Sequence, residues 1–212
     1  MNKETTILFI LFTLLLLVGG VIFYAKHRDQ ERFFIYHGTN GDYRIELFVN
    51  GNQTDYYVYA LSQETLYRIP LRKSPKDVEN IPLEQGLLKK IQRPEGTQHV
   101  YLTEDYDTPN KTGQLSLISL IDIGKILGNA EYGIYKLNVQ GALTTSTEHS
   151  LELEVPKITC SNVNSTTAVI YLTLGETNKI YSQDDCIIVE GKDAEGITLA
   201  ANKLAYYLLG VF

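Results

Sequence analysis

The sequence predicts an α/β protein with an N-terminal transmembrane helix, and an α+β arrangement of the same elements is also compatible with it. Three observations support this prediction. Residues 5–25 form an uninterrupted apolar run, residues 33–73 alternate between apolar and polar positions, and residues 84–212 alternate between strand-like and helix-like segments. Alternation with a period of two indicates antiparallel strands, whereas alternating strands and helices indicate strand–helix–strand units around a mixed sheet.

The apolar run at residues 5–25 contains no charged side chain and matches the roughly 20 residues that cross a bilayer as a helix. A short flank, residues 1–4, precedes it, and a basic linker, residues 26–32, follows it. The run exceeds the apolar core of about 7–15 residues typical of a signal peptide, and no small-x-small cleavage site follows it. We therefore expect a retained single-pass anchor, with residues 5–25 in the lipid bilayer.

Composition indicates a globular domain behind this anchor. The chain is 44% hydrophobic and 21% charged, near the average for folded domains, and its net charge is -6. An acidic domain is repelled by phosphate, so we expect no nucleic-acid partner. Neither a phosphate-binding loop nor a dinucleotide fingerprint is present, and no cofactor is expected.

The first part of the domain, residues 33–73, reads as an antiparallel β lobe. Strands are expected at Phe33–His37, Tyr43–Val49, Asp55–Leu61 and Leu66–Leu71. Asn50-Gly51 between alternating segments predicts a hairpin, and the three further residues before Asp55 predict a longer loop. Pro70 cannot donate to a ladder, which places the fourth strand at an edge.

Prolines at 75 and 82 predict an extended connection over Ser74–Leu83, and the α/β part, residues 84–212, follows. Its first half is expected to contain a helical turn at Leu87–Gln92, a strand at Val100–Thr103, a turn at Asn110–Gly113, a helix at Gln114–Leu127 and a strand at Gly133–Val139. The helix is apolar nearly all round, so we expect it to be buried.

The last third contains three further strand patterns and a C-terminal helix. Strands are expected at Ser150–Val155, Ala168–Leu174 and Cys186–Val189. Asp193 is a suitable N-cap for a helix at Ala194–Leu209, and Gly210 is a suitable stop. An apolar stripe is expected to pack on the sheet: Ile197, Ala200, Ala201, Leu204, Ala205 and Leu208. The opposite face carries polar groups: Glu195, Thr198, Asn202 and Tyr206.

Three kinds of candidate site follow from side-chain chemistry. Cys160 and Cys186 form a disulfide if the domain lies outside the cell and remain reduced thiols if it lies inside. Glu104, Asp105 and Asp107 follow a predicted strand and could hold Mg²⁺ or Ca²⁺, the alternative being a solvated acidic loop. No linear motif of a catalytic nucleophile or a zinc site is present, so no catalytic residue is assigned.

Membrane orientation can be read in two ways. Lys26, Arg28 and Arg32 outnumber the basic residues before the run, which favours a domain inside the cell. Three Asn-x-Ser/Thr sequons, at Asn52, Asn110 and Asn164, and the two cysteines favour a domain outside. We expect the outside orientation, with these asparagines as glycosylation candidates.

Two segments resemble known proteins. The residues Cys186–Gly191 followed by Glu195–Ala201 resemble a strand–turn–helix of archaeal S-layer and related envelope proteins. The order of Ile69–Arg72, Ile126–Ile134, Gly141–Thr144 and the Cys186 segment resembles uncharacterised single-span membrane proteins of small-genome archaea. The resemblance implies an envelope setting and supplies no catalytic residues.

These observations favour a non-enzymatic, membrane-anchored cell-surface domain that binds or scaffolds a protein partner in an archaeal envelope. One alternative is a membrane-tethered hydrolase that uses a divalent metal at the Glu104–Asp107 acids. Another is an accessory subunit of a membrane complex with its domain in the cytoplasm.

Overall fold

The structure is a computed structural model that describes residues 13–24, 33–51, 53–62, 64–92, 96–105, 113–129, 132, 134–146 and 154–212, without the side chains of residues 113–116. Residues 13–24 form a helix. The remaining elements are β1 (Phe33–Gly38), β2 (Gly41–Asn50), β3 (Gln53–Ser62), β4 (Thr65–Leu71), α2 (Pro75–Val78), α3 (Leu88–Ile91), β5 (His99–Glu104), α4 (Gly113–Leu127), β6 (Val139–Leu143), η1 (Cys160–Asn162), β7 (Thr167–Leu174), β8 (Lys179–Gln183), β9 (Cys186–Gly191) and α6 (Ala194–Leu208). The predicted mixture of helices and strands is confirmed.

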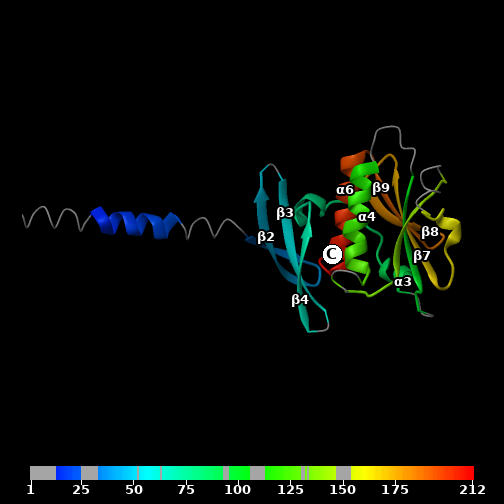
Figure 1. Cartoon of the computed structure of the whole chain (residues 1–212), viewed down its shortest axis with the longest axis horizontal. Helices are drawn as coiled ribbons and strands as arrows, with labels where there is room; N and C mark the ends of the chain where they lie inside the picture. The colour runs from blue at the N-terminus through cyan, green and yellow to red at the C-terminus, as the bar shows by residue number, and fades with distance from the viewer. Residues whose placement is uncertain are drawn as a thin grey trace, which may run out of the picture.

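Two sheets enclose a layer of helices (Figure 1). The first sheet is antiparallel with the order β1-β2-β3-β4, and the second is mixed with the order β6-β5-β7-β9-β8. Helices α4 and α6 lie between them and contact each other. Ile45 and Val58 of the first sheet, Leu204 of α6 and Ile170 of the second sheet belong to one continuous apolar cluster. The sheets therefore share one core.

The hairpin of β2 and β3 is tighter than the sequence predicts. Asn50 pairs with Gln53, so only two residues connect the strands, and Gly51 has a positive φ of 60°. The expected longer loop is wrong because Gln53 and Thr54 join the ladder. The fourth strand and its edge position are confirmed.

The expected extended connection after β4 is also wrong. Pro75 opens the short helix α2, where its missing N–H would have no helical partner. The Ser74 hydroxyl accepts a hydrogen bond from the Lys76 N–H, and the Asp77 carboxylate accepts one from the Ser74 N–H, at 3.3 and 3.1 Å. This capping box, Ser-x-x-Asp, fixes the turn that leads from the first sheet to the rest of the chain.

Two strand predictions in the α/β part need correction. The strand after α4 lies at Val139–Leu143 and not at 133–139, because the preceding segment is bound to the helices. The Leu137 N–H donates to the Leu127 carbonyl at 3.0 Å, and the Tyr135 hydroxyl donates to the Leu208 carbonyl at 2.6 Å. Glu154 has a φ of 53° and lies outside any strand, while residues 147–153 lie outside the described residues. The antiparallel edge strand β8 was not predicted.

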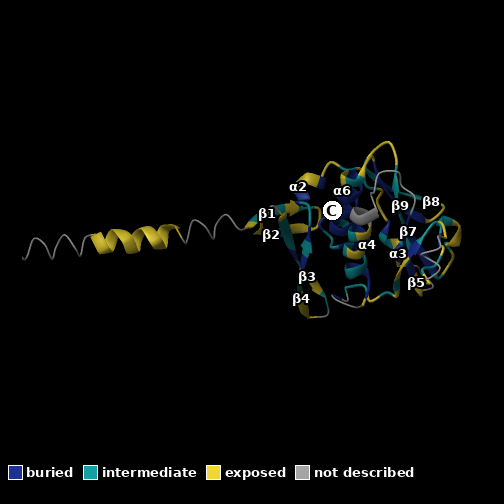
Figure 2. Cartoon of the chain, turned by 45° about the horizontal axis from the view of Figure 1, so that its top comes forward, coloured by how far each residue is buried: buried dark blue, intermediate teal, exposed yellow. Residues whose placement is uncertain are grey.

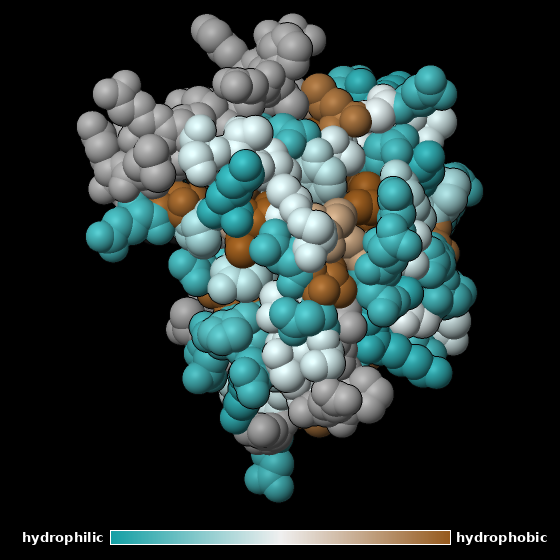
Figure 3. Space-filling view, turned by 90° about the vertical axis from the view of Figure 1, so that its right-hand side faces the viewer, coloured by the Kyte–Doolittle hydropathy of each residue, from teal (hydrophilic) through white to brown (hydrophobic). Residues whose placement is uncertain are grey.

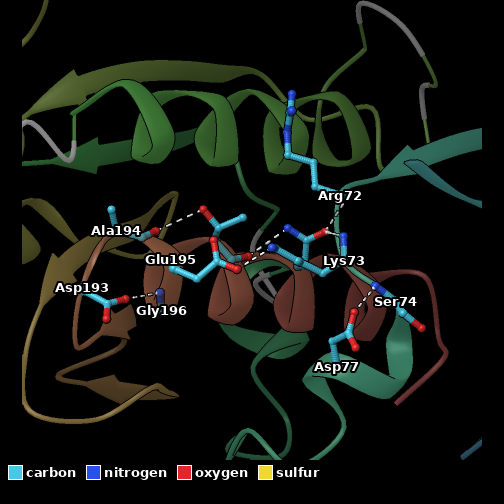
Figure 4. A network of polar contacts seen from close by, with 10 residues as sticks. Arg72, Lys73, Ser74, Asp77, Asp193, Ala194, Glu195 and Gly196 are labelled. Carbon is cyan, nitrogen blue, oxygen red and sulfur yellow. Dashed lines mark hydrogen bonds and ion pairs between the residues drawn. The ribbon is translucent and has the colours of Figure 1, made fainter. Parts of the chain in front are cut away.

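Helix α6 confirms its predicted cap, stop and apolar stripe, but not its exposed polar face. The side chains of Thr198, Asn202 and Tyr206 are buried. The Asn202 amide oxygen accepts from the backbone N–H groups of Arg72 and Lys73, at 3.0 and 3.2 Å. Figure 4 shows Arg72 and Lys73 beside the helix. This face is buried because the end of the first sheet packs on it and uses its polar atoms.

Helix α4 is not buried all round. Leu117 and Ile121 are exposed, whereas Leu120, Ile123 and Ile126 are buried. One apolar side of this helix therefore lies outside the core and is exposed.

The two faces of the second sheet are covered differently. Helix α4 connects β5 to β6 on one side of β5, and the chain then returns past β5 to β7 on the other side. Right-handed crossovers in opposite directions must use opposite faces of a sheet. Accordingly, α4 and α6 cover one face, while Ile158, Cys160 and Val163 pack on Val169 and Ile188 on the other.

Candidate functional site

The carboxyl ends of the parallel strands form the edge at which ligands bind in open α/β sheets. The strand order changes direction between β5 and β7, so this switch point lies beside the residues that follow β5. Asp105 is the first residue after β5, and it is one of the acids singled out in the sequence.

The Asp105 carboxylate is surrounded by hydroxyl groups. Tyr171 donates to it at 2.5 Å and Thr173 at 3.4 Å, both from β7, and Thr144 donates from the segment after β6. Three strands are therefore joined at this edge through one carboxylate. Burial and the hydrogen bond to Asp105 raise the pKa of the Tyr171 hydroxyl to about 12, so it remains a donor at neutral pH.

Two of the three predicted acids, Glu104 and Asp105, lie in the described part of the chain, and they lie on opposite faces of the second sheet. Glu104 is largely buried on the helix-covered face with Leu102, whereas Asp105 reaches the opposite face, as alternation along a strand requires. Asp107 lies outside the described residues. No group of three carboxylate, histidine or cysteine side chains could hold a metal ion among the described residues. A metal site at Glu104, Asp105 and Asp107 therefore stays a prediction.

A second carboxylate at the same edge, Glu190 of β9, was not recognised in the sequence. It is 7% exposed and accepts from the Thr177 N–H at 3.2 Å, the Tyr181 hydroxyl at 3.2 Å and the Lys179 ammonium at 3.4 Å. Burial opposes ionisation, but these donors outweigh it and lower the pKa of Glu190. A side chain at Gly175 would overlap the carboxylate, so glycine is needed where the β7–β8 loop crosses it.

Both carboxylates are occupied by internal donors. Asp105 fixes β5, β6 and β7 relative to one another, and Glu190 fixes the β7–β8 loop on β9. These contacts position the strands relative to one another. No sequence pattern identified Glu190, because its donors come from a loop and an edge strand.

The predicted disulfide is present between Cys160 and Cys186, whose Cα atoms are 5.3 Å apart. Cys160 begins η1 and Cys186 begins β9. The bond therefore holds the segment that covers the side of the second sheet opposite to α4 and α6. This side of the molecule is largely hydrophilic, with small separate hydrophobic areas (Figure 3).

Of the three sequons, only Asn164 lies in the described chain. Its side chain is exposed, and its amide oxygen accepts from the Thr166 N–H at 2.9 Å in a local turn. Asn52 and Asn110 lie outside the described residues.

The N-terminal helix, residues 13–24, carries apolar side chains that are exposed along its length (Figure 2). Among the described residues, no helix is both apolar and long enough to span a bilayer.

Comparison with known proteins gives no match among family models, curated proteins or solved structures.

Proposed function

We propose that the chain is a single-pass membrane protein that holds a disulfide-bonded, non-enzymatic domain on the outer face of an archaeal cell, where it binds or scaffolds an envelope partner. One observation carries the membrane part of this proposal. Nine large apolar residues in the 13–24 helix are between 52% and 72% exposed: Leu14, Leu15, Leu16, Leu17, Val18, Val21, Ile22, Phe23 and Tyr24. Water-soluble proteins rarely expose so large a contiguous apolar surface.

The helix lies inside a longer apolar run. The helix covers residues 13–24, and the sequence is apolar from residue 5 to residue 25. A helix through the whole run would be about 30 Å long, which is the thickness of the hydrocarbon core. Lipid is the solvent that removes the cost of exposing these side chains.

The outward orientation is supported by the disulfide. Bonds between cysteines persist in oxidising surroundings and are rare where cellular thiols keep them reduced. The exposed turn at Asn164 supports the same side, because glycans need an accessible asparagine. The proposed envelope setting rests on the resemblance of residues 186–201 to S-layer and related proteins.

A binding or scaffolding role is favoured by the use of the polar groups at the carboxyl edge. Asp105 and Glu190 are held by internal hydroxyl, amide and ammonium donors. Such groups stabilise a rigid domain, and a rigid tethered domain suits the presentation of a surface to a partner.

Membrane extraction tests the anchor. The chain is expected to remain with the membranes in alkaline carbonate and to be released by detergent, because a span resists washing. Leu16→Asp in the apolar run is expected to release a fraction of the protein, since a carboxylate in hydrocarbon is costly. The matched change Leu117→Asp on α4, also at an exposed leucine, is expected to leave membrane retention unchanged. Quantitative release of the unaltered chain by carbonate would contradict the proposal.

The binding role is tested on the same membranes. After mild solubilisation, a partner that co-purifies with the unaltered chain in stoichiometric amount supports scaffolding. A chain that behaves as a free monomer at native abundance contradicts it.

A further inference from the structure

The outward side of the first sheet is unusually apolar. The inner side packs Ile45 and Val58 into the core, so alternation predicts polar residues on the other side. That side, here called the outer face, instead carries Phe33, Ile35, Phe48 and Tyr57 with Arg44 and Arg68. Phe33, Ile35 and Phe48 are 38%, 46% and 49% exposed.

The aromatic rings on the outer face are held by the two arginines. The Arg44 guanidinium lies 4.3 Å from the centroid of the Phe33 ring, and the Arg68 guanidinium lies 3.6 Å from the centroid of Tyr57. Both arginines also contact the Glu46 carboxylate, at 3.1 and 3.4 Å. Guanidinium groups stacked on rings at a fixed position form a rigid, amphipathic surface.

Acidic and basic groups are mixed on this surface. Arg44 and Arg68 lie among three carboxylates: Glu46, Asp55, which pairs with Phe48 across the β2–β3 ladder, and Asp42, which pairs with His37 across the β1–β2 ladder. A partner attracted mainly by charge would therefore gain little here. A partner with both apolar and polar groups would bind this surface more favourably. Aromatic rings mixed with arginine are a composition that favours the interfacial region of a bilayer.

The chain itself determines which apolar partner is close. Eight residues, 25–32, separate the N-terminal helix from Phe33, the first residue of β1. They reach at most about 30 Å when extended, and about 15 Å as a flexible coil. At this spacing a surface meets its neighbour at an effective concentration of the order of millimolar, so weak intrinsic affinity is sufficient. In Figure 1 the N-terminal helix lies at the end of the molecule where the first sheet is found.

We infer that the outer face docks on the lipid headgroup region of the membrane that holds the N-terminal helix, with Phe33, Ile35 and Phe48 entering the interface. The inference rests on the proposed membrane anchor. It orients the domain, because the disulfide-bonded side then points away from the membrane and is available to an envelope partner.

The absence of tryptophan from the chain permits a direct test. Single tryptophans are introduced into the full chain by Phe48→Trp on the outer face, Leu117→Trp on α4 and Leu16→Trp in the apolar run. Each protein is reconstituted in phosphatidylcholine vesicles with and without bromine on the acyl chains, which quenches tryptophan on contact. Ile35→Trp provides a second reporter on the outer face if Phe48→Trp does not fold.

The expected result is loss of emission in brominated vesicles for the reporters at positions 16 and 48, and none at position 117. Because apolar side chains, and not ion pairs, are inferred to enter the interface, the loss at position 48 should persist in about 1 M salt, where the Debye length is about 3 Å. Quenching at position 16 without quenching at position 48 or 35 overturns the inference and leaves the anchor intact. That outcome includes an outer face covered by a second copy or another protein. No quenching at position 16 refutes the proposed anchor itself.

Discussion

Replacing Asn202 with alanine tests how α6 is held between the two sheets. The side chain is 2% exposed, and its amide oxygen accepts from the Arg72 and Lys73 N–H groups at 3.0 and 3.2 Å. Its amide nitrogen donates to the Thr198 carbonyl at 2.8 Å. Alanine removes the acceptor and leaves the backbone N–H groups of Arg72 and Lys73 without it.

The magnitude follows from those two donors. An unsatisfied buried N–H costs about 1–3 kcal/mol. Arg72 and Lys73 are only partly buried, so we take the lower part of that range for each and expect a loss of about 2–4 kcal/mol in the free energy of unfolding. For a domain of this size the melting temperature should fall by roughly 5–15 °C.

The assay is thermal unfolding of the full chain in detergent, followed by the near-ultraviolet circular dichroism of its tyrosines. Glu195→Ala is the matched control on the same helix, because Glu195 pairs with Lys73 at the surface and such pairs contribute about 0–1 kcal/mol. If Asn202→Ala loses no more stability than Glu195→Ala, the amide does not join the sheet to the helix and the reasoning is refuted.

Three further predictions concern other parts of the fold. Burial lowers the pKa of Lys203 to about 8, below the unfolded value of about 10.4. Between these values the unfolded chain binds more protons, so the free energy of unfolding should rise from about pH 8 to 10. In Lys203→Met the free energy of unfolding, measured by denaturation across this range, should depend less on pH, and an unchanged dependence would contradict the assignment. Replacing Cys160 and Cys186 with serine should cost about 3 kcal/mol in urea unfolding, because the bond closes a loop of 26 positions; free thiols in the native protein would remove this contribution. Asp105→Ala should cost about 1–3 kcal/mol and Tyr171→Phe less, since the first change leaves several hydroxyl donors without their acceptor; equal stability of Asp105→Ala and the unaltered chain would show that the carboxylate does not hold the strands.

Elements with strong local signals could be predicted from the sequence. The strands that become β2, β3, β7 and β9 followed from alternation or apolar runs, and Asp193 and Gly210 bounded α6 correctly because caps depend on adjacent residues. The capping box at Ser74 is visible in the sequence as Ser-x-x-Asp, but the two prolines predicted an extended chain instead.

What could not be predicted depends on contacts between distant segments. Asn202 and Tyr206 looked like a solvent-facing side of α6, and only the arrival of Lys73 from the first sheet explains their burial. Asp105 finds its partners on β7, and Glu190 finds its partners on β8 and the preceding loop. Helix α6 is covered by a sheet on each side, and its polar side chains bond the backbone that follows β4. The periodicity of the helix sequence does not reveal that a second sheet covers it.

The most direct test of the membrane-anchored, outward-facing domain is protease accessibility on intact cells, with the disulfide assayed in the same sample. We expect added protease to remove the domain from the cell surface, and we expect Cys160 and Cys186 to resist thiol reagents until they are reduced. A domain fully protected in intact cells, degraded only after lysis and carrying two free thiols would contradict it.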